Sequence, residues 1–200
     1  VAVGAITLQR AVPAQLATLD GQVPSRLIHL VHGLLAEIRD LDQRIRALDA
    51  ELASALTDDP VAERLQSVPG VGIITASALL GSVPHIHQFH RGRQFASWLG
   101  LTPREAASGH RLWRGAVSKR GDVYLRTLLI HGARSVIEHT KHKPRWLEQM
   151  LQRRPPNVVA VALANKMART AWALVAHGRE YQREWKSTPP KGCTAQASAA

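Results

Sequence analysis

The chain has only one cysteine, Cys193, which stands in a polar stretch near the end of the sequence. One thiol cannot form an internal disulfide framework, and it cannot supply the several thiolates of a structural zinc site. Disulfide-stabilised secreted domains and thiolate zinc domains are therefore excluded. The cysteine count fits a protein of the reducing cytoplasm, and a cytoplasmic location is expected.

Aromatic residues are also scarce, at 4% of 200 residues, and no apolar run reaches 18 residues. Few aromatics together with many Ala and Leu favour helices over strands, so we expect an all-α fold. Without a long apolar run, we expect no membrane-spanning helix. The first ten residues lack the basic start of a secretory signal, so none is expected.

Acidic residues are few in the second half of the chain. Residues 1–100 carry eight Lys and Arg against nine Asp and Glu, whereas residues 101–200 carry eighteen against six, which gives the formal net charge of +11. So uneven a charge indicates a polyanionic partner. DNA or RNA fits best, because cation–phosphate contacts release counterions, and an anionic membrane is the weaker alternative.

A heptad pattern runs from Ser25 to about Leu56. Its spacing predicts a coiled-coil seam with Leu at the d positions and mostly β-branched residues at a, which favours two strands in a parallel pair. We therefore expect a homo-oligomer, or pairing with another coiled-coil segment. The alternative is a long helix folded back on its own domain. The seam positions are Leu27, Val31, Leu34, Ile38, Leu41, Ile45, Leu48 and Leu52.

Two short apolar segments, Val61–Val68 and Ile73–Leu80, follow the heptads and are predicted to be helices. Asp59 is the expected N-cap of the first, with Pro60 as its first helical residue. The Pro-Gly-Val-Gly turn between them predicts a helix-hairpin-helix.

The two glycines of this turn, Gly70 and Gly72, are expected to leave backbone N–H groups open at the start of a helix. Such a helix N-terminus binds anions, and here we predict a DNA phosphate. In the alternative, a plain αα-hairpin, the glycines serve only the turn.

Three histidines with H-x-H-x-x-H spacing, His85, His87 and His90, come next. The spacing suggests a metal site, but no cysteine or carboxylate joins the cluster. Solvated loop histidines are the preferred interpretation, and we assign no metal site.

Further helices are expected over Arg93–Leu99, Val123–Thr140, Pro144–Leu151 and Val158–Ala176. Asp122 and Asn157 are the expected N-caps of the second and fourth of these. Gly100 is expected to end the first in the left-handed conformation, and Gly178 is expected to end the last. In the first of these helices we expect Trp98 to face the core.

The most informative stretch, Pro103–Arg126, has no apolar rhythm over its first 18 residues and is expected to be an irregular loop. It holds two serines, Ser108 and Ser118, among cations, and a hydroxyl in such a setting can attack or hold a phosphodiester. We predict that Ser118 and six basic residues contact nucleic acid. The basic residues are Arg104, Arg111, Arg114, Lys119, Arg120 and Arg126.

Three segments of this chain resemble a known family. In order they are L-x-x-V-P-G-V-G-x-x-T-A-x-x-L-L, Q-F-A-S-W-L-G-L-T-P-R and S-G-H-R-L-W-R-G-A-V-S-K-R-G-D-V-Y-L-R. They are similar to the C-terminal domain of the insertion-sequence "one-ten" family, the DEDD/serine transposases that recombine DNA under a structured guide RNA. The resemblance covers Glu63 to about Ala176, and the preceding heptads resemble the coiled coil that links the two halves of such enzymes.

The resemblance implies that Ser108 is the nucleophile that forms a phosphoserine link with DNA, and that Ser118 is structural or binds phosphate. It also implies magnesium bound by four carboxylates of a RuvC-like N-terminal domain. This sequence does not include that domain, so we expect no cofactor in this chain. A fragment, a truncated copy, or a partner chain that supplies the metal site are the alternatives.

A serine hydroxyl is a weak nucleophile until its proton is removed. His110 and Glu105 are the acceptors within reach in the sequence, and the nearby cations can neutralise the transition state. Alternatively, each cation only positions the nucleic-acid backbone, and Ser108 is a turn serine before Gly109.

We divide the chain into an irregular segment 1–24, a linker helix 25–57, a helical transposase domain 58–186 and a disordered tail 187–200. The expected function is DNA cleavage and rejoining during transposition. The alternatives are a non-catalytic nucleic-acid-binding module and an inactive remnant that only dimerises.

Overall fold

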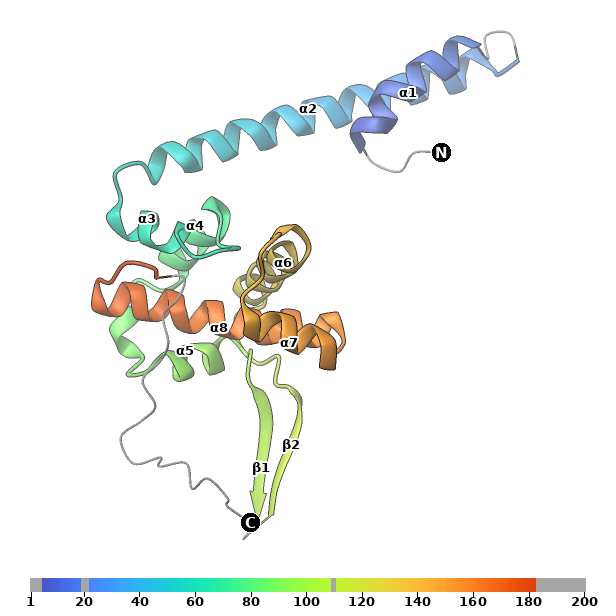
Figure 1. Cartoon of the computed structure of the whole chain (residues 1–200). Helices are drawn as coiled ribbons and strands as arrows, with labels where there is room; N and C mark the ends of the chain where they lie inside the picture. The colour runs from blue at the N-terminus through green and yellow to red at the C-terminus, as the bar shows by residue number, and fades with distance from the viewer. Residues whose placement is uncertain (1–4, 19–21, 109–110, 183–200) are drawn as a thin grey trace. The chain divides into compact units, whose positions relative to one another are not determined.

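The structure, a computed structural model, describes residues 5–18, 22–108 and 111–182. Within these ranges the chain is mainly helical, with eight α-helices, one 3-10 turn and one pair of β-strands (Figure 1). The expected helical class is confirmed, with a strand pair added. The chain separates into two compact units, Val1–Thr57 and Asp58–Ala200. The predicted tail 187–200 lies outside the described residues.

The first unit holds helices α1 (Ala5–Thr18) and α2 (Ser25–Ala55). We expected an irregular segment over residues 1–24, but Ala5–Thr18 form a helix that runs through Pro13. A proline inside a helix removes one backbone hydrogen bond, and here the helix continues without it. Helix α1 packs on α2, where Gln9 Nε2 donates to Asp42 Oδ2 at 2.8 Å.

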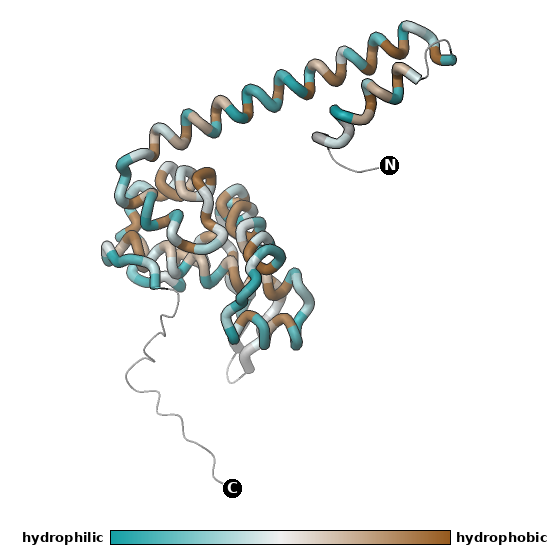
Figure 2. Tube along the Cα trace, turned by 45° about the horizontal axis from the view of Figure 1, so that its top comes forward, coloured by the Kyte–Doolittle hydropathy of each residue, from teal (hydrophilic) through white to brown (hydrophobic). Residues whose placement is uncertain are grey.

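Helix α2 confirms the long helix that the heptads predict, and apolar residues recur along its whole length (Figure 2). Leu35 is its buried residue, at 3% exposure. The leucines of the predicted d positions, Leu27, Leu34, Leu41 and Leu48, are instead between 50% and 60% exposed. The seam is therefore present as an uncovered apolar row, and its pairing with a second helix stays a prediction.

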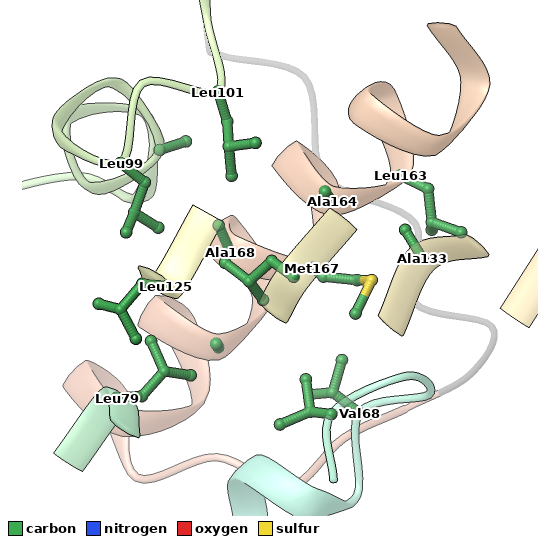
Figure 3. Packing of buried hydrophobic residues seen from close by; sticks show 14 of the residues in the cluster. Val68, Leu79, Leu99, Leu101, Leu125, Ala133, Leu163, Ala164, Met167 and Ala168 are labelled. Atoms are coloured by element: carbon green, nitrogen blue, oxygen red, sulfur yellow. The ribbon is translucent and has the colours of Figure 1, made fainter. Parts of the chain in front are cut away.

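The second unit is organised around α8, which packs against α3, α5, α6 and α7. Buried alanines on α8, among them Ala164 and Ala168, let these neighbours approach closely, while Leu163 and Met167 fill the space between them (Figure 3). The helices of this unit are α3 (Pro60–Gln66), α4 (Ile73–Ser82), α5 (Gly92–Trp98), α6 (Val123–His139), α7 (Arg145–Arg153) and α8 (Pro156–His177), with a 3-10 turn at Ile86–Gln88.

Helix α8 is also the one described helix that is long and apolar enough to cross a membrane by length and composition, with a mean hydropathy of 1.3. Eight of its residues are buried in this unit. Its apolar character is therefore accounted for by the core.

Two of the three expected helix caps are present. Asp59 accepts hydrogen bonds from two backbone N–H groups of α3, at 2.8 and 3.3 Å, and Asp122 accepts one from α6 at 2.8 Å. The prediction for Asn157 is wrong, because α8 begins one residue earlier, at Pro156. Asn157 Oδ1 instead accepts a hydrogen bond from Arg134 Nη2 at 3.1 Å.

The ends of α5 and α8 follow the sequence pattern. Gly100 and Gly178 adopt φ values of +71° and +59°, as expected for left-handed helix stops. The prediction that Trp98 faces the core holds only in part, since its ring packs on Phe89 and Phe95 but the residue is 39% exposed.

The turn between α3 and α4 lies against α6. Gly70 has a φ of +86°, and a Cβ at this position would lie 2.7 Å from the carbonyl oxygen of Gly132. Gly72 is exposed, and an added Cβ would have nothing within 4 Å. The geometry assigns Gly70 to packing and leaves Gly72 as the open glycine of the predicted phosphate site.

We expect Gly70→Ala to lower the free energy of unfolding by roughly 2–4 kcal/mol, because it combines left-handed strain with a backbone clash. The matched control is Gly81→Ala, at a helical position of α4 with nothing within 4 Å, which should stabilise by up to about 1 kcal/mol. Urea unfolding followed by circular dichroism measures both. A Gly70→Ala protein as stable as the parent would contradict the packing role.

Candidate nucleic-acid interface

The stretch between α5 and α6 forms an antiparallel hairpin of β1 (Pro103–Ser108) and β2 (Arg111–Val117). It projects away from the helices of its unit (Figure 1). The prediction of an irregular loop is therefore wrong. Strands need an alternating apolar pattern only where one face is buried, and the ribbon residues whose exposure is described, 103–105, 113 and 115–117, are exposed or half-buried.

The hairpin separates the two candidate serines. Ser108 is the last residue of β1 and pairs with Arg111, whereas Ser118 follows β2 at the base. The five residue steps from Pro103 to Ser108 correspond to about 17 Å along an extended strand. The two serines therefore cannot act on the same phosphate group.

Ser118 is tied into the base of the hairpin. Its N–H donates to the carbonyl oxygen of Thr102 at 2.9 Å, and its own carbonyl oxygen accepts from Arg104 Nη2 at 3.5 Å. Both contacts involve the backbone of Ser118, so they fix its position, and the role of its hydroxyl stays a prediction. His110, the candidate proton acceptor, lies outside the described residues.

Arg126, on the first turns of α6, holds the base of the hairpin together. It is only 9% exposed, and its Nη1 lies 3.2 Å from the carbonyl oxygen of Leu99 and 3.5 Å from those of Gly121 and Asp122. A buried guanidinium that donates to backbone carbonyls is a structural group. The prediction that Arg126 contacts nucleic acid is therefore corrected.

Further hydrogen bonds to backbone carbonyl groups hold the base of the hairpin. Lys119 N–H donates to the carbonyl oxygen of Gly100 at 3.2 Å, and Asn165 Nδ2 donates to that of Leu101 at 3.1 Å. Lys119 has a φ of +54°, which is uncommon for a residue with a side chain. At Gly121 an added Cβ would clash with the carbonyl oxygen of Trp98. The hairpin thus rises from a closely packed root.

The remaining predicted cations fall into two groups. Arg104, Lys119 and Arg120 are exposed and lie in sequence at the base of the hairpin. Arg111 and Arg114 occupy register positions opposite Ser108 and Glu105, toward the outer end. Of the residues expected to surround Ser108, only Arg111 is its direct cross-strand neighbour.

A second group of cations lies on the helices. Partial burial, followed by the charge of Arg169, lowers the pKa of Lys166, and burial followed by the charge of Arg93 lowers the pKa of Arg169. Lys166 Nζ also lies 4.3 Å from the centre of the Trp146 ring. Cations that repel one another in this way favour an anion between them. Their i, i+3 spacing on α8 was visible in the sequence, but the approach of Arg93 from α5 was not.

The histidines between α4 and α5, His85, His87 and His90, are all exposed. Over the described ranges, no three His, Cys, Asp or Glu side chains are grouped to hold a metal ion. The described residues therefore do not fit a magnesium site.

Comparisons with known proteins agree on one family. Residues 62–149 match the profile of the IS116/IS110/IS902 family of transposases. The chain is 46% identical over 171 residues to a probable family 20 transposase of Pseudomonas aeruginosa, with 84% of this chain and 51% of that protein covered. It is 39% identical over 183 residues to the transposase for insertion sequence element IS1111A of Coxiella burnetii, with 90% and 50% covered. The chain spans about half the length of the curated relatives it matches.

We expect Arg126→Met to lower the free energy of unfolding by about 2–3 kcal/mol, because buried carbonyl groups lose a charged donor. Arg120→Met, an exposed neighbour, should change it by less than about 0.5 kcal/mol. Urea unfolding of the two variants provides the comparison. Equal stability of both variants would show that Arg126 does not hold the base.

Proposed function

The chain belongs to the IS116/IS110/IS902 transposase family, and we propose that it binds DNA through the β1–β2 hairpin and supplies Ser108 as the nucleophile for strand cleavage and rejoining. The observation that carries the proposal is the position of Ser108. It is the last residue of a strand that projects from the helical unit, next to Arg111 in register. A projecting strand end is open to a DNA backbone, whereas the base of the hairpin is packed.

The proposed reaction is a phosphoryl transfer. The Ser108 oxygen forms a bond to the phosphorus while the bond from phosphorus to a deoxyribose oxygen breaks. The serine proton passes to an acceptor, and the departing deoxyribose oxygen takes up a proton. The phosphodiester is conserved as a phosphoserine ester, so a free deoxyribose hydroxyl can reverse the step and rejoin the strand without ATP.

Cations near the reacting phosphate make this step easier, because charge builds up on its oxygens in the transition state. Arg111 is best placed by register for that role, and Arg114 is three residues farther along β2. Arg104, Lys119 and Arg120 at the base are too far along the ribbon for the same phosphate, and we assign them to the flanking DNA backbone.

A further phosphate contact is proposed at the start of α4. Gly72 is the N-cap of this ten-residue helix, is exposed, and has open space where a side chain would lie. A phosphate can approach the free N–H groups there, and the helix dipole favours it. The basic second half of the chain supports this assignment.

Complete recombination is proposed to need groups that the described residues do not supply. Four carboxylates with magnesium, expected in a RuvC-like domain from the family resemblance, would assist the serine, and the described residues offer no such cluster. A structured guide RNA is the proposed second polyanion, and the cytoplasm the proposed location. A non-catalytic binding module is the competing function, favoured by the cations Arg93, Lys166 and Arg169 far in sequence from Ser108.

Helix α2 is proposed to join protomers through its uncovered leucines. Replacing Leu41 and Leu48, which are 50% and 59% exposed, with Asp should give monomers without unfolding α2. Sedimentation equilibrium measures the change. A monomeric parent protein would contradict the proposal.

The nucleophile is tested with nicked insertion-sequence end DNA, which traps a covalent intermediate because the cleaved piece diffuses away. With a RuvC-like domain from a relative and magnesium supplied, we expect a protein–DNA adduct that resists denaturation. Ser108→Ala should abolish it, since Ser108 is the only Ser, Thr or Tyr in the sequence from Pro103 to Val117.

The matched control is Ser118→Ala, at the base of the same hairpin, which should still form the adduct. An adduct that survives Ser108→Ala would refute the assignment. Salt-sensitive DNA binding without an adduct in any variant would favour the non-catalytic function.

A further inference from the structure

Trp113 is unusually exposed for its size. It is the third residue of β2, and 61% of its surface is accessible. An indole is among the side chains that gain most from leaving water, so a Trp on a projecting ribbon indicates a surface that binds something. Trp98 differs, because its ring stacks on Phe95 and the residue is less exposed, at 39%.

The ring of Trp113 lies against Gly115. A Cβ added to Gly115 would lie 2.6 Å from Cη2 and 2.8 Å from Cζ3 of Trp113, so the six-membered ring lies across the place where a side chain would be. Gly115 stands two residues along the same strand, and thus on the same face. The ring thus lies against Gly115 while 61% of the residue stays accessible, and a ring restrained in this way loses less entropy on binding.

The register places this platform on the face of the proposed nucleophile position. Trp113 pairs with Ala106, and Arg111 pairs with Ser108. Residues two apart in one strand point to the same face of a ribbon, and so do residues paired across the two strands. Positions 108 and 113 therefore share a face. A base next to the phosphate at position 108 would be within reach of position 113.

We propose that Trp113 is a stacking platform for an unpaired nucleobase of the DNA strand that reacts at Ser108. The proposal rests on the proposed function, since it requires DNA on the hairpin. Bases beside a strand break must leave their pairs before strands are exchanged, and an aromatic face compensates for the stacking they lose.

Charge distinguishes this surface from a protein-docking patch. Trp113 stands between Arg111 and Arg114 in the sequence, which suits a nucleic-acid strand. The large exposed apolar residues of α2 are aliphatic and, apart from Leu30, lie at the predicted seam positions, which suits another helix. A nucleobase is therefore the occupant we assign to Trp113.

The test compares binding of the 200-residue chain to a labelled thymidine oligonucleotide and to a blunt duplex of equal phosphate number. We expect Trp113→Ala to weaken binding to the single strand roughly 5- to 100-fold and binding to the duplex by less than about twofold. Trp113→Leu should behave like Trp113→Ala, because it keeps apolar bulk without a π-face. Trp113→Phe should retain most of the affinity.

Tyr124→Ala is the control, since Tyr124 is 58% exposed but lies on α6. It should leave the ratio of single-strand to duplex affinity unchanged. As a second readout, 5-iodouracil in the oligonucleotide should photo-crosslink to Trp113. Peptide mass spectrometry identifies the crosslinked residue.

Three results would overturn the inference. They are an unchanged single-strand affinity of Trp113→Ala, a full single-strand affinity of Trp113→Leu, or a loss of single-strand affinity in Tyr124→Ala equal to that in Trp113→Ala. If the parent binds duplex DNA in a salt-sensitive way and Trp113→Ala matches it on both ligands, only the stacking role fails. If the parent binds neither DNA, the proposed function fails with it.

Discussion

The guanidinium of Arg126 determines where the hairpin stands. It joins the end of α5, through Leu99, to the start of α6, through Gly121 and Asp122, and these are the two points between which the hairpin leaves and re-enters the helical unit. Because Leu99 is fully buried and Asp122 caps α6, movement at this root would disturb both the core and a helix end. The packed base therefore orients the ribbon relative to the core, and a reacting side chain requires such a fixed support.

This arrangement divides the basic residues by task. Arg126 is buried and bonded to backbone carbonyl groups, and Arg104 donates a hydrogen bond to the carbonyl oxygen of Ser118. Exposed cations remain at the base of the hairpin and on α5 and α8, where a nucleic-acid backbone is proposed to run. The net charge of +11 thus supports the proposed extended binding, while the proposed chemistry depends on the few groups near Ser108.

Local rules explain what could be predicted from the sequence. Asp59 and Asp122 were identifiable as caps because capping depends on neighbouring residues, and Gly100 and Gly178 because only a left-handed stop needs glycine there. The hairpin was missed because its sequence has no period of two, and none of the strand residues whose exposure is described is buried to impose one. The roles of Arg126 and Gly70 were missed because each depends on a backbone segment distant in sequence, which no local pattern reveals.

Hydrogen exchange of backbone amides, with and without bound DNA, tests most directly whether a firmly rooted hairpin is the DNA-binding element. Amides at the root, such as that of Lys119, should exchange slowly before DNA is added, since they are bonded at a packed base. Amides of β1 and β2 should slow markedly when DNA binds. Hairpin amides that exchange at the same rate with and without DNA, while α8 or α2 becomes protected, would contradict the account.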